Sequence, residues 1–107
     1  MEARPRTIDD YLTEDGESPF REWLNKYHGE RIFGIIFARF LRVEKGNLGD
    51  HESVGSGVSE LRINFGPGFR IYYGEDGDLI VLLFGGTKKT QVQNIKTAKK
   101  YWEDYNA

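Results

Sequence analysis

The stretch that decides the fold runs from Gly57 to Gln91 and reads GVSELRINFGPGFRIYYGEDGDLIVLLFGGTKKTQ. From Ser59 to Phe65, apolar and polar residues alternate with the period of two that is typical of a half-buried strand. Gly66-Pro67-Gly68 interrupts the pattern, and the alternation resumes from Phe69 to Tyr73. The sequence therefore predicts a β-hairpin with a three-residue connection.

The predicted hairpin brings two arginines close together. Its simplest register places Phe65 opposite Phe69, so that Asn64 lies opposite Arg70 and Arg62 lies opposite Tyr72. One face then carries four polar side chains: Arg62, Asn64, Arg70 and Tyr72. The other face carries six apolar ones: Leu61, Ile63, Phe65, Phe69, Ile71 and Tyr73. Diagonal neighbours in a sheet are about 7–8 Å apart, and two guanidinium groups at that spacing repel each other unless an anion lies between them. The arginine pair therefore indicates an anion-binding site.

Length and composition limit the possible classes of protein. With 107 residues, 38% of them hydrophobic and 14% aromatic, the chain is expected to form one folded domain. The absence of cysteine excludes a disulfide scaffold and a thiolate metal site. The longest apolar run, Leu79 to Phe84, is too short to span a bilayer. We therefore expect a cytoplasmic protein without a membrane partner.

Charge is unevenly distributed along the chain. The formal net charge is −2, but residues 1–60 carry 8 Lys/Arg and 12 Asp/Glu, whereas residues 62–100 carry 7 and 3. A polyanion responds to the local potential of one face rather than to total charge, so nucleic acid stays a candidate partner despite the acidic total.

The flanking segments predict helices around a small sheet. Pro5 to Thr13 is a weak strand candidate. Ser18 before Pro19 is typical of a helix N-terminus, and apolar spacing continues that helix to about His28. Glu30 to Lys45 predicts a second helix with one apolar stripe: Phe33, Ile36, Phe37, Phe40 and Val43. Arg31, Arg39 and Arg42 lie off this stripe, and we interpret them as a solvated or partner-binding face.

The remaining segments complete an α+β prediction. Gly46 is placed to end the second helix, and Gly46 to Gly57 reads as a long glycine-rich loop without periodicity. Leu79 to Phe84 predicts a central strand, and Thr87 or Thr90 is expected to cap a last helix. The apolar stripe of that helix would be Ile95, Ala98, Trp102 and Tyr105. We expect a three-strand antiparallel meander plus an N-terminal strand, with two N-terminal helices and one C-terminal helix.

Candidate site residues surround the arginine pair. Arg62, Arg70 and Lys88 could hold a phosphate and stabilise charge on a pentacoordinate phosphorus, which metal-free RNA cleavage requires. His51, Glu52 or Tyr72 could transfer protons, and further RNA contacts could come from three residues: Asn64, Lys89 and Gln91. Two structural alternatives stay open, in which Arg62 pairs with Glu60, Glu52 or a backbone carbonyl and His51 lies in a surface loop. No set of residues has metal-ligand spacing, so no metal or cofactor is expected.

Four sequence blocks carry a family resemblance. They are G-N-x-G-D, E-L-R-I, G-P-G-[FY]-R and G-G-x-K, in that order, and SPFREWL and RFLRVEKGNLGD precede the stretch quoted first. Across essentially its whole length the chain resembles the RelE/HigB toxin superfamily, and more narrowly the branch labelled addiction module killer protein. By that resemblance Arg70 matches the arginine after the hairpin turn, which is the family's best candidate for phosphate contact. Arg62 matches the E-L-R-I arginine, and Lys88 and Gln91 match the basic residue and the glutamine after the last strand.

The resemblance also implies a function and partners. It implies a small sheet packed on two N-terminal helices, a helix-turn-helix antitoxin encoded next to the toxin, and a free toxin that enters the ribosome and cuts mRNA without a metal. Two other functions stay open: a ParE-like inhibitor of DNA gyrase that cleaves nothing, and a degenerate toxin that only binds its antitoxin.

Overall fold

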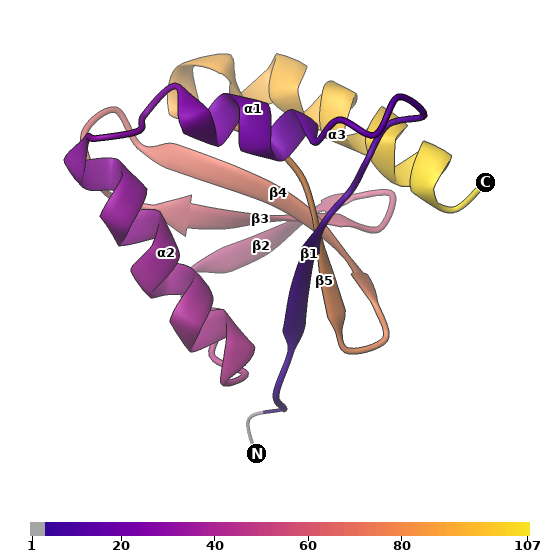
Figure 1. Ribbon diagram of the computed structural model, residues 1–107, viewed down its shortest axis with the longest axis horizontal. Coiled ribbons are helices and arrows are strands. Elements are labelled where there is room, and N and C mark those ends of the chain that lie inside the picture. The colour runs from indigo at the N-terminus through magenta and orange to yellow at the C-terminus, as the bar shows by residue number, and fades with distance from the viewer. Residues whose placement is uncertain (1–3) are drawn as a thin grey trace.

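The computed structural model describes residues 4–107, which form an α+β domain of one five-stranded mixed sheet and three helices (Figure 1). The elements in chain order are β1 (Thr7–Asp10), α1 (Pro19–Asn25), α2 (Arg31–Glu44), β2 (His51–Gly55), β3 (Val58–Ile63), β4 (Phe69–Asp76), β5 (Leu79–Thr87), a 3₁₀ turn (Lys88–Thr90) and α3 (Gln91–Tyr105). The strand order is β1-β5-β4-β3-β2. Strand β1 runs parallel to β5, and the four other strands form an antiparallel meander.

The prediction of a three-strand meander was wrong by one strand, because the segment expected to be a loop contains β2. This strand joins β3 through Ser56 and Gly57, which have φ angles of 56° and 81°. Positive φ at both central residues is the geometry of a tight two-residue hairpin turn. Strand β2 lies at the edge of the sheet and is almost entirely exposed. An exposed edge strand needs no apolar alternation, so the periodicity gave no signal for it.

The register predicted for the arginine hairpin was also wrong. Ile63, not Phe65, pairs with Phe69, and Arg62 lies directly opposite Arg70. The chain leaves the ladder after Ile63 because the Phe65 amide donates to the Ile63 carbonyl (3.0 Å) and the Gly68 amide donates to the Phe65 carbonyl (3.0 Å). The connection therefore has five residues, 64–68. A shift of two residues leaves every strand side chain on its predicted face.

Helices cover both faces of the sheet (Figure 1). On one face, apolar residues of β3, β4 and β5 pack against α1 and α2, whose buried residues include Phe20, Trp23, Leu24, Ile36 and Phe40. On the other face, which carries Arg62, Arg70 and Tyr72, α3 packs through Ala98, Ile95 and Trp102. The apolar run Leu79 to Phe84 lies in β5 between β1 and β4, as predicted for a central strand. None of the helices in residues 4–107 has the length and apolar content needed to cross a bilayer.

Two local predictions for the helices are confirmed. The Ser18 hydroxyl accepts a hydrogen bond from the Arg21 amide (3.0 Å), with Pro19 at the first position of α1. Gly46 follows α2 with a φ of 95°, the left-handed conformation that ends a helix. The predicted first helix is shorter than expected, ending at Asn25, because the next amides form turn bonds.

Arg39 departs from its prediction as part of an exposed basic face. Its side chain is buried and donates to three backbone carbonyls: Nε to Leu48 (3.0 Å), Nη1 to Arg62 (2.9 Å) and Nη2 to Asp50 (2.6 Å). The guanidinium therefore ties α2 to the segment before β2 and to the end of β3. Gly49 is required beside it, because a Cβ there would lie 2.9 Å from the guanidinium carbon.

We predict that Arg39→Ala lowers the free energy of unfolding by about 3 kcal/mol, because it leaves three carbonyls without their charged donor. Urea denaturation followed by circular dichroism measures the loss. The matched control is Arg42→Ala, which removes an exposed arginine of the same helix and should change stability by less than about 0.5 kcal/mol. Equal losses in the two variants would show that Arg39 does not hold the loop.

Candidate functional site

A shallow depression of about 320 Å³ lies at the tip of the arginine hairpin. Its lining consists of seven residues: Asn64, Phe65, Gly66, Pro67, Gly68, Arg70 and Lys88. Three elements supply them, namely the connection after β3, the start of β4 and the 3₁₀ turn after β5. The Lys88 amide donates to the Gly68 carbonyl (2.7 Å), which holds the turn against the connection. The structure thus brings together three predicted site residues, Asn64, Arg70 and Lys88.

Arg70 is a fixed cation at this depression. Only 8% of the residue is exposed, and its Nη1 donates to its neighbour's carbonyl, that of Phe69 (3.1 Å). Its buried Nε has no hydrogen-bond partner within the described part of the chain. The nearest carboxylate oxygen to this atom, that of Glu60, is 3.9 Å away, too far for a hydrogen bond. Arg70 therefore has a charge that is only partly compensated.

The sequence predicts Glu60 only as a possible partner of Arg62 and misses its bonds to Gln91. Glu60 is fully buried, accepts from Arg62 Nε (2.8 Å) and accepts from Gln91 Nε2 with both carboxylate oxygens (3.0 and 3.2 Å). The anion expected between the two arginines is thus a side chain of the chain itself. The sequence indicates that Glu60 lies beside Arg62, because residues two apart on one strand share a face of the sheet.

Arg62 takes the structural alternative that the sequence left open. It pairs with Glu60 and, through Nη2, with Glu52 on the neighbouring strand β2. It does not line the depression. Gln91, predicted to contact RNA, is likewise bonded to Glu60, while Lys89 is exposed beside Lys88 without lining the depression.

Neither of the two ring-bearing candidates for proton transfer, Tyr72 and His51, lines the depression. Tyr72 is fully buried, and burial together with the nearby Glu60 carboxylate raises its pKa to about 12, so it stays protonated at neutral pH. His51 pairs with Leu61 across the β2–β3 ladder, which puts its side chain on the sheet face opposite Arg62 and Arg70. Its Nδ1 donates to the Gly49 carbonyl (2.8 Å). Among residues 4–107 no three His, Asp or Glu side chains gather as metal ligands.

One relative identifies the family. The chain is 46% identical over 81 residues to an uncharacterized protein of Haemophilus influenzae, a match that spans 75% of this chain and 82% of the relative. The chain belongs to the same family as this Haemophilus protein. No protein-family profile matches the sequence, and no solved structure matches it. The match spans three quarters of the domain, but the relative carries no known activity that could be compared with this site.

We predict that Glu60→Gln lowers the free energy of unfolding by about 3 kcal/mol, because it removes the charge that compensates two arginines in a buried site. The control is Glu52→Gln, which alters the other partner of Arg62. Its side chain is 60% exposed, so that variant should lose less than about 1 kcal/mol. Both values come from urea denaturation at neutral pH, and a Glu60 variant as stable as the parent would contradict the assigned role.

A second prediction concerns alkaline pH. The folded pKa of Tyr72 is about 12 against an ordinary value of 10, so unfolding releases its proton once the pH exceeds 10. Its contribution to stability should be complete below pH 10 and decline as the pH rises toward 12. Tyr72→Phe should therefore show a shallower loss of unfolding free energy over that range than the parent. Parallel curves for the two proteins would contradict the raised pKa.

Proposed function

We propose that this chain is the toxin of a type II toxin–antitoxin module, and that it acts in the cytoplasm as a ribosome-dependent mRNA endonuclease with a RelE-like fold. The single observation that supports it is the convergence of Arg70 and Lys88 on a depression that is otherwise lined by an amide and a glycine-proline connection. A phosphodiester fits this set of groups, since guanidinium and ammonium groups are the usual phosphate donors in proteins.

The two cations have different physical characters. Arg70 is 92% buried and held by its own strand, so it presents a charge whose position is set before any ligand arrives. Lys88 is exposed and forms no ion pair within residues 4–107, so its ammonium is free to follow the phosphate. Donors fixed in advance stabilise charge that develops on phosphorus without reorganisation, which is where most electrostatic catalysis arises.

The charge around the depression favours a polyanion. Residues 79–102 contain five lysines and no acidic residue, and they run from β5 through the 3₁₀ turn into α3. Lys88, Lys89, Lys96 and Lys100 are exposed. This basic segment begins at the depression with Lys88 and continues along α3, and it would attract RNA although the whole chain is acidic.

The lining of the depression limits what the chain does by itself. Its seven residues include no histidine and no carboxylate, the side chains that most often accept a proton such as that of a ribose 2′-hydroxyl. In cleavage the ribose 2′-oxygen would bond to phosphorus as the bond from phosphorus to the 5′-oxygen breaks. Arg70 and Lys88 would bind the phosphate and stabilise its charge. Groups of the ribosome would take the 2′-hydroxyl proton and give a proton to the leaving 5′-oxygen. Cleavage would then depend on the ribosome, because this chain would supply the phosphate-binding groups and the ribosome the groups for proton transfer.

The lack of a histidine or carboxylate in the lining also favours a second candidate, a toxin-like protein that binds its target without cleaving it. DNA gyrase would be that target in a ParE-like inhibitor, and a degenerate toxin would keep only its helix-turn-helix antitoxin. Both need the fold and its charged surface but no group for proton transfer.

We predict that induced expression of the parent stops growth of a bacterial host, and that Arg70→Ala and Lys88→Ala each lower mRNA cleavage by about 100-fold, because each removes a donor to the phosphate. Growth curves and mapping of mRNA 5′ ends within codons measure the effects. Arg42→Ala is the control, since this exposed arginine does not line the depression.

Three results would separate the candidates. An Arg70→Ala variant that is folded by thermal denaturation and cleaves like the parent would overturn the site. Loss of gyrase supercoiling without mRNA cleavage would establish the second candidate. If expression of a helix-turn-helix protein from the neighbouring reading frame relieves growth arrest, the chain is part of a toxin–antitoxin module, whichever target the toxin has.

A further inference from the structure

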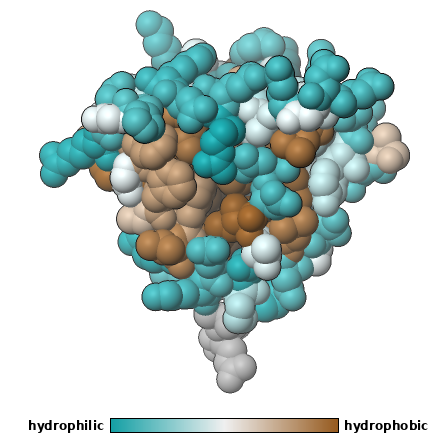
Figure 2. All heavy atoms as spheres, viewed as in Figure 1, coloured by the Kyte–Doolittle hydropathy of each residue, from teal (hydrophilic) through white to brown (hydrophobic). Residues whose placement is uncertain are grey.

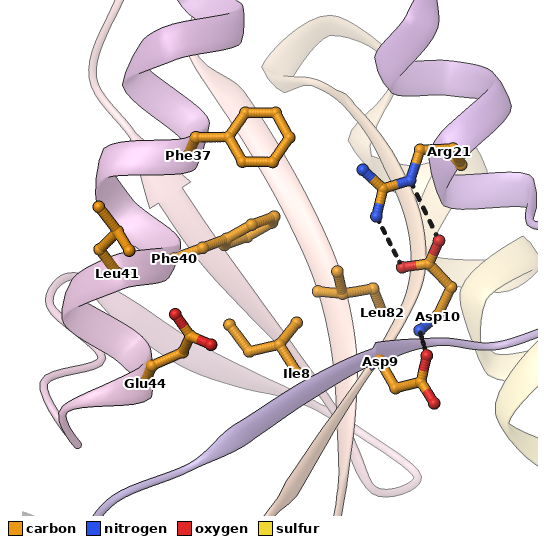
Figure 3. Close-up of a pocket in the computed structure, with 9 residues that line it drawn as sticks. All are labelled: Ile8, Asp9, Asp10, Arg21, Phe37, Phe40, Leu41, Glu44 and Leu82. Atoms are coloured by element: carbon orange, nitrogen blue, oxygen red, sulfur yellow. Dashed lines mark hydrogen bonds and ion pairs between the residues drawn. The ribbon is translucent and has the colours of Figure 1, made fainter.

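An apolar groove separate from the depression lies between α2 and β1. It has a volume of about 370 Å³ and is lined by Ile8, Asp9, Asp10, Arg21, Phe37, Phe40, Leu41, Glu44 and Leu82. Figure 3 shows the aromatic rings of Phe37 and Phe40 extending from α2 toward Ile8 and Leu82. In the space-filling view, hydrophobic atoms gather in this region with polar side chains around them (Figure 2).

Two large apolar side chains of this groove are exposed. Leu41 is 62% exposed and Phe37 is 39% exposed, and they lie four residues apart on one side of α2. Phe40 and Ile8 continue the apolar surface inward to the core. A concave surface of this kind, with large apolar side chains at helical spacing, fits the apolar stripe of another helix.

A strand is a poorer occupant, although β1 is an edge strand. It has only four residues. The Arg6 amide just before it already donates to the Glu44 carbonyl (2.9 Å), and the Asp10 amide is bonded to the Asp9 carboxylate (2.8 Å). Few backbone groups are left on this edge for an added strand, so the groove favours side-chain packing over strand addition.

The rim of the groove is acidic. Asp10 forms a two-pronged ion pair with Arg21 (both distances 3.2 Å), whereas Asp9 and Glu44 form no ion pair within residues 4–107. In a symmetric pair of copies this rim would face itself and bring unpaired carboxylates together. A partner with lysine or arginine beside its apolar stripe would neutralise them instead.

We propose that the groove binds an amphipathic helix of a different protein, with apolar residues at i, i+3 or i+4, and i+7, and with basic residues flanking them. The shape and the acidic rim of the groove support this proposal independently of the proposed function. The groove and the depression share no lining residue, so a helix bound in the groove need not contact Arg70 or Lys88.

The test uses two designed helical peptides with the same leucine stripe, one flanked by lysines and the other by glutamates. Binding to the whole chain is measured by fluorescence anisotropy at low and at high salt. The lysine peptide should bind about tenfold more tightly than the glutamate peptide at low salt, and the preference should shrink at high salt. The double variant Asp9→Lys, Glu44→Lys should bind the glutamate peptide more tightly than the lysine peptide at low salt.

Matched variants separate the groove from the rest of the surface. Leu41→Ser should weaken binding of the lysine peptide about tenfold. Val92→Ser removes a 74% exposed apolar side chain of α3 outside the groove and should leave binding of the lysine peptide unchanged. Because no step uses toxicity or cleavage, the peptide result stands or falls separately from the proposed function.

Two outcomes would overturn the proposal. One is equal binding of the two peptides, or binding that Leu41→Ser does not weaken. The other is a dimer of the chain, seen by light scattering across a concentration series, that Leu41→Ser dissociates, because a second copy would then be the occupant.

Discussion

The buried carboxylate of Glu60 is the interaction on which the candidate site depends. It lies on β3 and bonds Arg62 of the same strand and Gln91 at the start of α3, while Arg70 of β4 lies at 3.9 Å. A buried carboxylate without these partners would be very unfavourable, and so would two adjacent arginines without the carboxylate. Through its bonds to Gln91, the Glu60 carboxylate also joins β3 to the start of α3. The distances also distinguish the two arginines: Arg62 forms close ion pairs with Glu60 and Glu52, whereas the charge of Arg70 is only partly compensated.

Apolar patterning predicted the framework of the fold. The run Leu79 to Phe84 indicated a strand covered on both faces, and the structure places it between two strands with a helical layer on each side. Even the register error in the hairpin left the faces correct, because a shift of two residues preserves the side-chain alternation. The alternation of apolar and polar residues predicts which face a side chain occupies. It does not predict the hydrogen bonds of the turn, which set the register.

Polar residues were predicted less well, for reasons that differ from case to case. Arg39 looked like a surface charge because helical spacing cannot show that three carbonyls of a distant loop converge on it. Strand β2 went unseen because its exposed residues need no pattern, although the Ser56-Gly57 pair was a turn signal. His51 was expected near the arginines from chain proximity alone, and the strand pairing turned it to the other face. Arg70, Lys88 and Asn64 could be predicted because one hairpin and the turn after β5 supply all three.

The two surfaces proposed to bind partners have opposite charge, and this accounts for the acidic total of a chain that is proposed to meet RNA. The segment from residue 79 to residue 102 carries five positive charges, so the remaining residues together carry a net charge of −7. Part of that excess, Asp9 and Glu44, lies beside the groove on α2 and β1 rather than beside the depression. A polyanion and a basic helix would therefore be directed to different faces by electrostatics alone. Net charge is then a poor guide to the ligand of such a domain, because it averages two surfaces of opposite charge that are proposed to bind different partners.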